Sequence, residues 1–211
     1  METFQRARKP EHRELRRQAV LDAARELLLE LPAADVSLRE IARRLGGSKS
    51  GIVTYFETRE ALFLALLQRE RASWLDEFEQ AEFTQAGGEI TEFWARSLAA
   101  RPVLCELWSM LASTLERNVS AELIREFKLE TSEQMQRQAR LVARHVPGLT
   151  EAAADELVST SIVVLIGLWP FANPTPAVVE ATSDPRLASA RVDFVTRYRR
   201  ALQVLITSLT H

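Results

Sequence analysis

Small polar residues and one lysine follow a pair of glycines in the first quarter of the chain. Ser48, Lys49, Ser50 and Gly51 come directly after Gly46-Gly47. Ser48 is a residue type that caps helices, and small side chains behind it let a helix start approach a groove wall closely. The unpaired amides of a helix start also favour phosphate. The pattern is typical of nucleic-acid contact, although Ser48 could be only a cap and Lys49 only a solvated charge.

The elements around these residues have the dimensions of a helix-turn-helix. Ser37-Leu-Arg-Glu40 has the spacing of a capping box, in which a hydroxyl and a carboxylate each bond a backbone amide. The helix that it starts ends at Gly46-Gly47, and a preceding helix that stops before Pro32 would brace the pair. Spacing alone leaves DNA binding and an ordinary helical protein equally open.

Composition excludes several other classes of protein. The 211 residues carry a formal charge of −2, so a polyanion must be held by a local patch, and the first 60 residues are the positive end. One cysteine, Cys105, and three scattered histidines offer no metal site and no disulfide. Paired carboxylates, HExxH spacing and a Ser/His/Asp set do not stand out, so we expect no catalytic residue, no metal and no cofactor.

Helical periodicity covers almost the whole chain, and the sequence predicts an all-α fold of about nine helices. Thr58 caps a long fourth helix, and Gly87-Gly88 is a linker. Four prolines between Pro170 and Pro185 predict a loop without regular structure, followed by a last helix from Leu187 to about Leu209. We expect a DNA-binding domain over residues 1–60, with a basic N-terminal arm, and a helical ligand-binding and dimerisation domain over residues 61–211.

No apolar run reaches the roughly 20 residues of a bilayer span, which predicts a cytoplasmic protein with no membrane partner.

Three segments of the first third carry a more specific likeness. They are Val20-Leu-Asp-Ala-Ala-Arg-Glu-Leu-Leu28, Ser37-Leu-Arg-Glu-Ile-Ala42 and Leu45-Gly-Gly-Ser-Lys-Ser-Gly-Ile-Val-Thr-Tyr-Phe-Glu-Thr-Arg-Glu-Ala-Leu-Phe63. In this order they closely resemble the DNA-binding domain of the TetR family of bacterial transcriptional regulators. The likeness covers residues 13 to 64, and beyond it only the length and the number of helices agree with the family.

The resemblance implies a role for each matching position. Arg39 corresponds to a site where some members touch a base edge, which a guanidinium can do bidentately with guanine. The recognition helix would bring groove contacts, and the positions around it would hold phosphates. The implied DNA-binding residues are Ser37, Arg39, Ser48, Lys49, Ser50, Gly51, Thr54, Tyr55, Thr58 and Arg59, while Arg43 and Arg44 are weaker candidates.

The sequence departs from the family pattern in three places. Pro32-Ala33 stands where a glycine and an aromatic residue are usual, and Gly47 stands where valine is usual. Val53 replaces a frequent tyrosine and so removes a phosphate contact. The basic arm Arg6-Ala-Arg-Lys9 could compensate along the DNA backbone, or it could be a disordered tail.

The second half of the chain offers candidates for a ligand cavity and for a dimer interface. An apolar or aromatic small molecule could be bound by Trp94, Cys105, Trp108, Met110, Phe127 and Met135. Each of these residues is explained as well by an ordinary core. The apolar helix that ends at Trp169 and the last helix would form a four-helix interface in a homodimer, unless both are buried within one subunit.

We therefore expect a homodimeric, ligand-responsive DNA-binding regulator. The simplest form is a repressor of a palindromic operator on double-stranded DNA, released by a small-molecule effector of apolar or aromatic character. The alternative is a helical dimer that acts as an interaction protein and has lost specific DNA binding through the departures at Val53 and Gly47.

Overall fold

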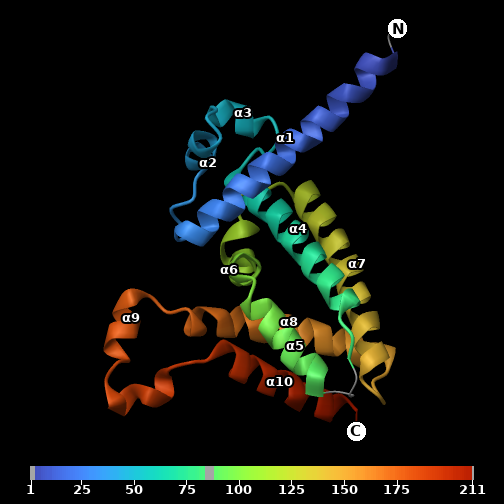
Figure 1. Ribbon diagram of the computed structural model, residues 1–211, viewed down its shortest axis with the longest axis vertical. Coiled ribbons are helices and arrows are strands. Elements are labelled where there is room, and N and C mark those ends of the chain that lie inside the picture. The colour runs from blue at the N-terminus through green and yellow to red at the C-terminus, as the bar shows by residue number, and fades with distance from the viewer. Residues whose placement is uncertain (1–2, 84–87, 211) are drawn as a thin grey trace.

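The computed structural model describes residues 3–83 and 88–210, with side chains from Pro10 onward (Figure 1). This part of the chain holds ten α-helices, one π-helical segment, one 3-10 segment and no strand. The predicted all-α class is confirmed, and the number of helices is close to the expected nine. Figure 1 shows α1, α2 and α3 toward one end of the long axis and α8 and α10 toward the other.

Three helices form a small unit at the N-terminal end, which we call the head: α1 (Thr3–Glu30), α2 (Leu38–Arg44) and α3 (Lys49–Val53). Apolar residues at helical spacing give each of them a buried side. Leu27 of α1, Ile41 of α2 and Ile52 of α3 belong to one buried cluster. α1 therefore braces the α2–α3 pair, as the spacing predicts.

The turn between α2 and α3 is closed by a Schellman motif. The Gly47 amide donates to the Ala42 carbonyl at 2.9 Å, and the Gly46 amide donates to the Arg43 carbonyl at 3.1 Å. Gly46 has a φ of 64°, a left-handed conformation that glycine adopts without strain. Gly47 needs no such freedom, since an added Cβ would lie 3.9 Å from the Ala42 carbonyl oxygen. The turn is thus set by Gly46, and a Cβ at position 47 would make only ordinary van der Waals contact.

α4 (Arg59–Gln80) joins the head to a larger unit, which we call the body. Its last turns bury Trp74, Leu75 and Phe78 there. The body consists of α5 (Gly88–Ala99), α6 (Pro102–Met110), the π-helical segment (Leu111–Leu115), α7 (Ala121–His145), α8 (Glu151–Ala172), α9 (Pro176–Ala181), the 3-10 segment (Pro185–Ala190) and α10 (Phe194–Leu209).

Regular structure occupies much of the segment where the prolines predicted a loop. α8 continues through Pro170 for two further residues, and α9 and the 3-10 segment follow. The loop prediction was wrong because Pro176 and Pro185 each stand in a first turn, where the missing N–H costs no hydrogen bond. Figure 1 shows this segment projecting to one side of the body.

The last helix begins later than the sequence predicted. α10 starts at Phe194 rather than at Leu187, because Asp193 caps it: a side-chain oxygen of Asp193 accepts a hydrogen bond from the Thr196 amide at 2.8 Å. Phe194 and Tyr198 then stack with ring centroids 5.2 Å apart and fix the start of the helix in the core.

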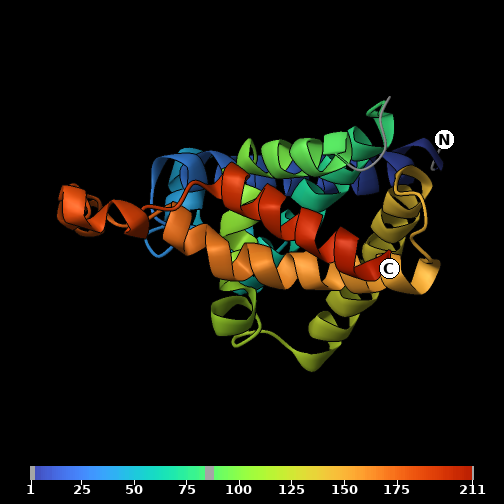
Figure 2. The same cartoon turned by 90° about the horizontal axis from the view of Figure 1, so that it is seen from below.

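α8 is the one helix in the described chain that is long and apolar enough to cross a membrane by length and composition. Only a third of its most apolar window is buried within the subunit. The core helices of many non-membrane proteins pass the same test. α8 packs against α6, α7 and α10 on one side, and Figure 2 shows it beside α10 along one surface of the molecule.

Candidate nucleic-acid interface

Residues from three helix starts meet around a hollow of about 640 Å³ on the head. The start of α2, the recognition helix α3 and the start of α4 all reach it. Its walls are formed by Ser37, Leu38, Arg39, Lys49, Val53, Glu57, Thr58 and Arg59. Five of the ten predicted DNA-binding residues are therefore brought together, and Glu57 adds one acidic side chain to the wall.

Three of the predicted hydroxyls act as helix caps. Ser37 accepts a hydrogen bond from the Glu40 amide at 3.2 Å, and Ser48 accepts one from the Gly51 amide at 3.3 Å. Thr58 accepts one from the Ala61 amide at 3.0 Å. Each cap holds the first turn of its helix in place, so these residues position the interface whether or not they touch a phosphate.

The capping box at Ser37 is only half formed. The Glu40 carboxylate accepts hydrogen bonds from Arg43 Nε at 3.2 Å instead of reaching back to its own cap. These bonds lower the pKa of the Glu40 carboxyl below its ordinary value. Spacing alone does not show this, because a nearby arginine competes for the carboxylate.

Arg39 and Lys49 are the cations that this surface leaves available. Both are exposed, and neither makes a hydrogen bond or an ion pair with any described residue. Both line the hollow, Arg39 from α2 and Lys49 from the start of α3. Their donors are thus free for a partner that carries acceptors or negative charge.

Three of the exposed residues at α3 and just after it are polar or small. Ser50, Gly51 and Thr54 are all exposed. The Thr54 hydroxyl donates to the Ser50 carbonyl at 3.2 Å, and the Ser50 hydroxyl lies 2.9 Å from that of Ser48. Such a surface can approach a groove closely, with no large side chain in the way.

Arg59 is already engaged within the head. Its Nε and Nη2 donate to Glu60 Oε1 at 3.1 and 3.0 Å, and its Nη1 donates to the Ala34 carbonyl at 3.4 Å. The guanidinium carbon lies 5.6 Å from the centre of the Phe63 ring. Arg59 therefore links the start of α4 to the turn after α1, a structural role that the resemblance did not indicate.

Arg43 and Arg44, the weaker candidates, are also ion-paired. Arg43 pairs with Glu40 on its own helix, and Arg44 pairs with Glu26 and Glu30 of α1. The ion pairs of Arg44 therefore connect α2 to α1.

The remaining predictions for the head concern three places in the chain. Tyr55 is half-buried and packs against the core cluster. Val53 lies on the wall of the hollow with 40% of its surface exposed, so a larger side chain has room there. The side chains of the basic arm, Arg6 to Lys9, lie outside the described residues, although the backbone there continues α1.

In the body, most of the predicted ligand residues are packed in the core. Trp94, Cys105, Trp108 and Phe127 are buried, and the Trp94 ring lies 6.3 Å from Trp74 and 5.8 Å from Phe78. Met110 and Met135 are partly buried against the same core. Phe127 also borders a hollow of about 280 Å³ between α1, α4 and α7. The arrangement favours the core reading for Trp94, and the ligand role of the six stays a prediction.

Cys105 has a structural setting. Its thiol donates to the Leu98 carbonyl at 3.3 Å, and burial raises the pKa of the thiol well above its usual range. A thiol that stays protonated is a poor nucleophile and a poor metal ligand, so the setting of Cys105 favours neither of those two roles. In the described residues, no group of three or more His, Cys, Asp and Glu side chains could hold a metal ion.

Sequence reasoning missed Arg71, which lies in the middle of α4. Its side chain is almost completely buried, and its guanidinium lies over the Trp108 ring at 5.2 Å from the centroid. No signal in the sequence marked this arginine, because arginine on a helix is ordinarily a surface residue.

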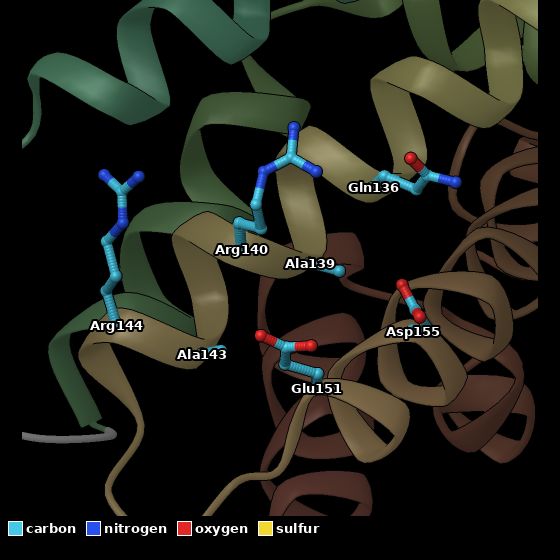
Figure 3. Close-up of a pocket in the computed structure, with 7 residues that line it drawn as sticks. All are labelled: Gln136, Ala139, Arg140, Ala143, Arg144, Glu151 and Asp155. Carbon is cyan, nitrogen blue, oxygen red and sulfur yellow. The ribbon is translucent and has the colours of Figure 1, made fainter.

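A further hollow, of about 560 Å³, lies between α7 and α8 (Figure 3). Ala139 and Ala143 form its apolar part, with Gln136 and two arginines on α7 and two acidic residues, Glu151 and Asp155, on α8. Figure 3 shows the guanidinium groups of Arg140 and Arg144 directed away from α8. Two cations and two carboxylates therefore line this hollow together.

Comparison with protein families matches nearly the whole chain. Residues 20–66 match the model described as bacterial regulatory proteins, tetR family, and residues 67–210 match the model described as tetracyclin repressor-like, C-terminal domain. The two matches meet inside α4. Comparison with curated proteins finds no sequence match.

Several solved structures share the fold at low identity. The regulator FadR from Bacillus subtilis, solved with stearoyl-CoA, is 14% identical over 92% of this chain and 99% of that chain, with a TM-score of 0.57. FadR from Bacillus halodurans is 15% identical over 92% and 96%, with a TM-score of 0.55. A TetR regulator from Rhodococcus sp. RHA1 is 18% identical over 94% and 98%, with a TM-score of 0.53.

These neighbours agree with the family match on the fold, and the head supplies the matching helix-turn-helix. With an N-terminal domain that binds DNA and a C-terminal domain that binds ligands, the chain belongs to the TetR family of bacterial transcriptional regulators.

Proposed function

We propose that the protein is a homodimeric repressor of a palindromic operator, released by a small apolar or aromatic effector. The observation that carries the DNA-binding part is the pair of exposed, unpaired cations, Arg39 and Lys49, that line the hollow formed by three capped helix starts. Arg39 would read a base edge, and the small side of α3 would enter the major groove. Residues 1–60 would act as the DNA-binding domain, in the cytoplasm.

The outward side of α8 and α10 supports a dimer. Val163 and Phe171 on α8 are 68% and 71% exposed, and Val204 on α10 is 52% exposed. Figure 2 shows the two helices side by side on one surface. Apolar side chains so exposed on neighbouring helices mark an interaction site, and the same two helices from a second copy would cover them in a four-helix arrangement. Burial of both helices within one subunit, the alternative to a dimer, accounts only for their inward-facing residues such as Leu165 and Leu202.

α4 provides the connection between effector and DNA. Its first residue, Arg59, borders the hollow on the head, and Trp74 and Phe78 lie in the core of the body. An effector that favours one tilt of α4 would change the distance between the two heads. It must bind one arrangement better than the other, and DNA must then weaken effector binding by the same factor.

Selection of bound sequences from a random DNA pool tests the proposal. A twofold dimer places two recognition helices about 34 to 36 Å apart, so an inverted repeat with this half-site spacing is expected. Failure to enrich any motif at moderate salt would favour the alternative, an interaction protein without specific DNA binding.

A further inference from the structure

Arg71 is a buried cation whose close partners are all neutral. Its side chain is 2% exposed. Nη1 donates to the Thr131 carbonyl and Nη2 to Gln138 Oε1, both at the long distance of 3.3 Å. No carboxylate of the described residues lies within ion-pair distance of it, while Arg69, two residues away, pairs with Asp22 at 2.7 Å.

A charge held in this way costs stability. Burial lowers the pKa of Arg71 to about 10, so the guanidinium remains charged at neutral pH. A buried charge without a counter-ion destabilises the fold, and an apolar side chain of similar size would avoid that cost. The face of the Trp108 ring offsets part of this cost, and the two hydrogen bonds to neutral carbonyl acceptors offset a further part.

The polar groups around Arg71 form a layer between α4 and α7. Gln68 Nε2 donates to the Phe127 carbonyl at 2.9 Å and to the Thr131 hydroxyl at 3.0 Å. Gln134 Nε2 donates to the Gln68 carbonyl at 3.3 Å. The other amide atom, Gln134 Oε1, is buried and has no hydrogen-bond partner. The layer thus contains both a cation without an anion and an acceptor without a donor.

We propose that Arg71 binds the carboxylate of the effector, which is a small organic acid with an apolar or aromatic body. This inference rests on the proposed function and specifies its ligand class. The guanidinium would donate two parallel hydrogen bonds to the two carboxylate oxygens, in place of its two long hydrogen bonds to neutral acceptors.

The surroundings favour a single carboxylate over a more highly charged group. Arg71 is one cation among Trp108, Phe127 and neutral amides, so a second negative charge would remain unpaired. The hollow between α1, α4 and α7 borders this layer through Gln68 and Phe127, although Arg71 itself is not in its wall. Its charged lining is mixed, with Arg17 and Arg69 beside Glu126 and Glu130. The hollow between α7 and α8 is unsuitable, since none of the residues that line it belongs to the layer around Arg71.

The position of Arg71 links such a ligand to α4. The arginine stands on α4, and both of its acceptors stand on α7. A carboxylate that takes over the guanidinium removes those two hydrogen bonds and loosens α4 from α7. This change is the differential contact that an effector needs to shift the heads.

The wild-type protein tests the ligand class through matched pairs of probes. Benzoate, phenylacetate, hexanoate and octanoate are each compared with the amide of the same carbon skeleton by titration calorimetry at neutral pH. For at least one pair, the acid is expected to bind about tenfold more tightly than its amide, or better, because a charged bond to arginine is stronger than a neutral one. Equal affinities within every pair, or no binding by any acid, would overturn the inference.

Two variants assign the preference to Arg71. Arg71→Met keeps the length of the side chain and removes the charge; we expect an unchanged or higher melting temperature and the loss of the preference for the acid. Arg140→Met, in the hollow between α7 and α8, is the matched control and is expected to keep the preference. A persisting preference in Arg71→Met would show that another group holds the carboxylate.

Arg71→Lys covers the case in which Arg71→Met does not fold. It keeps the charge but lacks the paired N–H donors of the guanidinium, so most of the preference for the acid over its amide should disappear while the protein stays folded. Full preference in Arg71→Lys would contradict bidentate binding.

The same proteins separate this inference from the proposed function. DNA binding is measured on the selected inverted repeat by fluorescence anisotropy, first without any acid. If the repeat is bound and no acid binds or releases the protein, the proposed function stands and the ligand class is wrong. If no sequence is selected, the proposed function itself fails, while the calorimetry still reports on Arg71.

Discussion

The head and the body hold their cations in opposite ways. On the head, Arg39 and Lys49 are exposed and unpaired around an open hollow. In the body, Arg71 is enclosed among neutral acceptors and one tryptophan ring. An exposed cation gains from a large polyanion that stays in water, whereas a buried one gains only from a partner small enough to enter the core. The contrast indicates two kinds of ligand for one molecule.

α4 belongs to both regions, which is why the contrast has a functional meaning. Arg59 stands at its start beside the hollow, and Arg71 stands three turns further along the same helix. In the proposed function a tilt of this one helix would couple the two regions, and such a coupling is established by measurement. Variants that separate the two regions therefore test the mechanism more directly than variants within either one.

The largest effect is expected from a charge on the outward side of the body. Val163→Glu places a carboxylate on α8 where the second subunit would cover it. We expect the dimer dissociation constant to rise by about a hundredfold or more, since each subunit would bury an unpaired charge. Sedimentation measures dissociation, and binding to the inverted repeat should fall with it, because one head alone loses the advantage of two linked sites.

Leu129→Glu is the matched control, on α7, where the native side chain is 61% exposed. It should leave both the dimer and DNA binding unchanged. If Val163→Glu also remained a tight dimer, the second subunit would have to contact another surface. Removal of α10 is a poorer test, because Phe194, Tyr198 and Leu202 belong to the core of the subunit itself.

The second prediction concerns base readout by the head. Arg39→Ala should weaken binding to the preferred sequence by about 1 to 3 kcal/mol and relax preference at one symmetric position in each half-site. A repeated selection with the variant measures the change. Arg43→Ala is the control: its guanidinium is exposed but paired with Glu40, so little change in preference is expected. Unaltered preference in Arg39→Ala would place this arginine on the phosphate backbone.

The sequence predicted the head better than the body, for physical reasons. Caps and turns depend on residues close in sequence, so Ser37, Gly46, Ser48 and Thr58 marked the helix ends correctly. Local patterns do not show competition between side chains. The carboxylate of Glu40, expected to complete the capping box, binds Arg43 instead.

The body depends on contacts between distant segments. Arg71 meets its partners on α7 some sixty residues later, and no local spacing indicates such a bond. Whether a large residue such as Trp94 lines a ligand cavity or packs in the core cannot be told from its size and spacing, and Trp94 packs against the rings of Trp74 and Phe78. The prolines led to a wrong loop prediction, since a proline in a first turn and a proline in a loop look alike in sequence.

The third prediction separates two roles of Arg59, its contribution to the stability of the head and its contact with a DNA phosphate. Arg59→Ala leaves the buried carboxylate of Glu60 without its partner, so we expect a loss of about 1 to 3 kcal/mol in the free energy of unfolding. If the guanidinium also holds a phosphate, preferred and unrelated DNA should weaken alike, and the salt slope should become shallower by about 1. Denaturant unfolding and titrations at several salt concentrations measure the two effects.

The double variant Arg59→Ala with Glu60→Gln separates these effects. It removes the unpaired charge and should recover most of the stability. DNA binding should remain weak if Arg59 touches a phosphate, and should recover along with stability if its role is only structural. A change in base preference in either variant would contradict the assignment of Arg59 to the backbone.

The smallest effect is expected from restoring an aromatic hydroxyl at position 53. Val53 borders the hollow and is 40% exposed, so a tyrosine ring can extend outward without overpacking the head. If the hydroxyl reaches a phosphate, Val53→Tyr should strengthen binding by about 0.5 to 1.5 kcal/mol, the net value of one hydrogen bond. The base preference should not change, because a phosphate carries no sequence information. The salt slope should hardly change either, because a neutral group displaces few counterions.

Val53→Phe is the control for this prediction, since it adds the ring without the hydroxyl. Equal gains in both variants would assign the effect to ring contact rather than to a hydrogen bond. Thermal melts must accompany the titrations, because a lower melting temperature would mean that the ring has turned inward and overpacked the head. Tighter binding with an altered base preference would place position 53 in the groove. The exposed side of α3 would then read bases together with Arg39. Position 53 would belong to the residues that contact bases and not to those that contact phosphates.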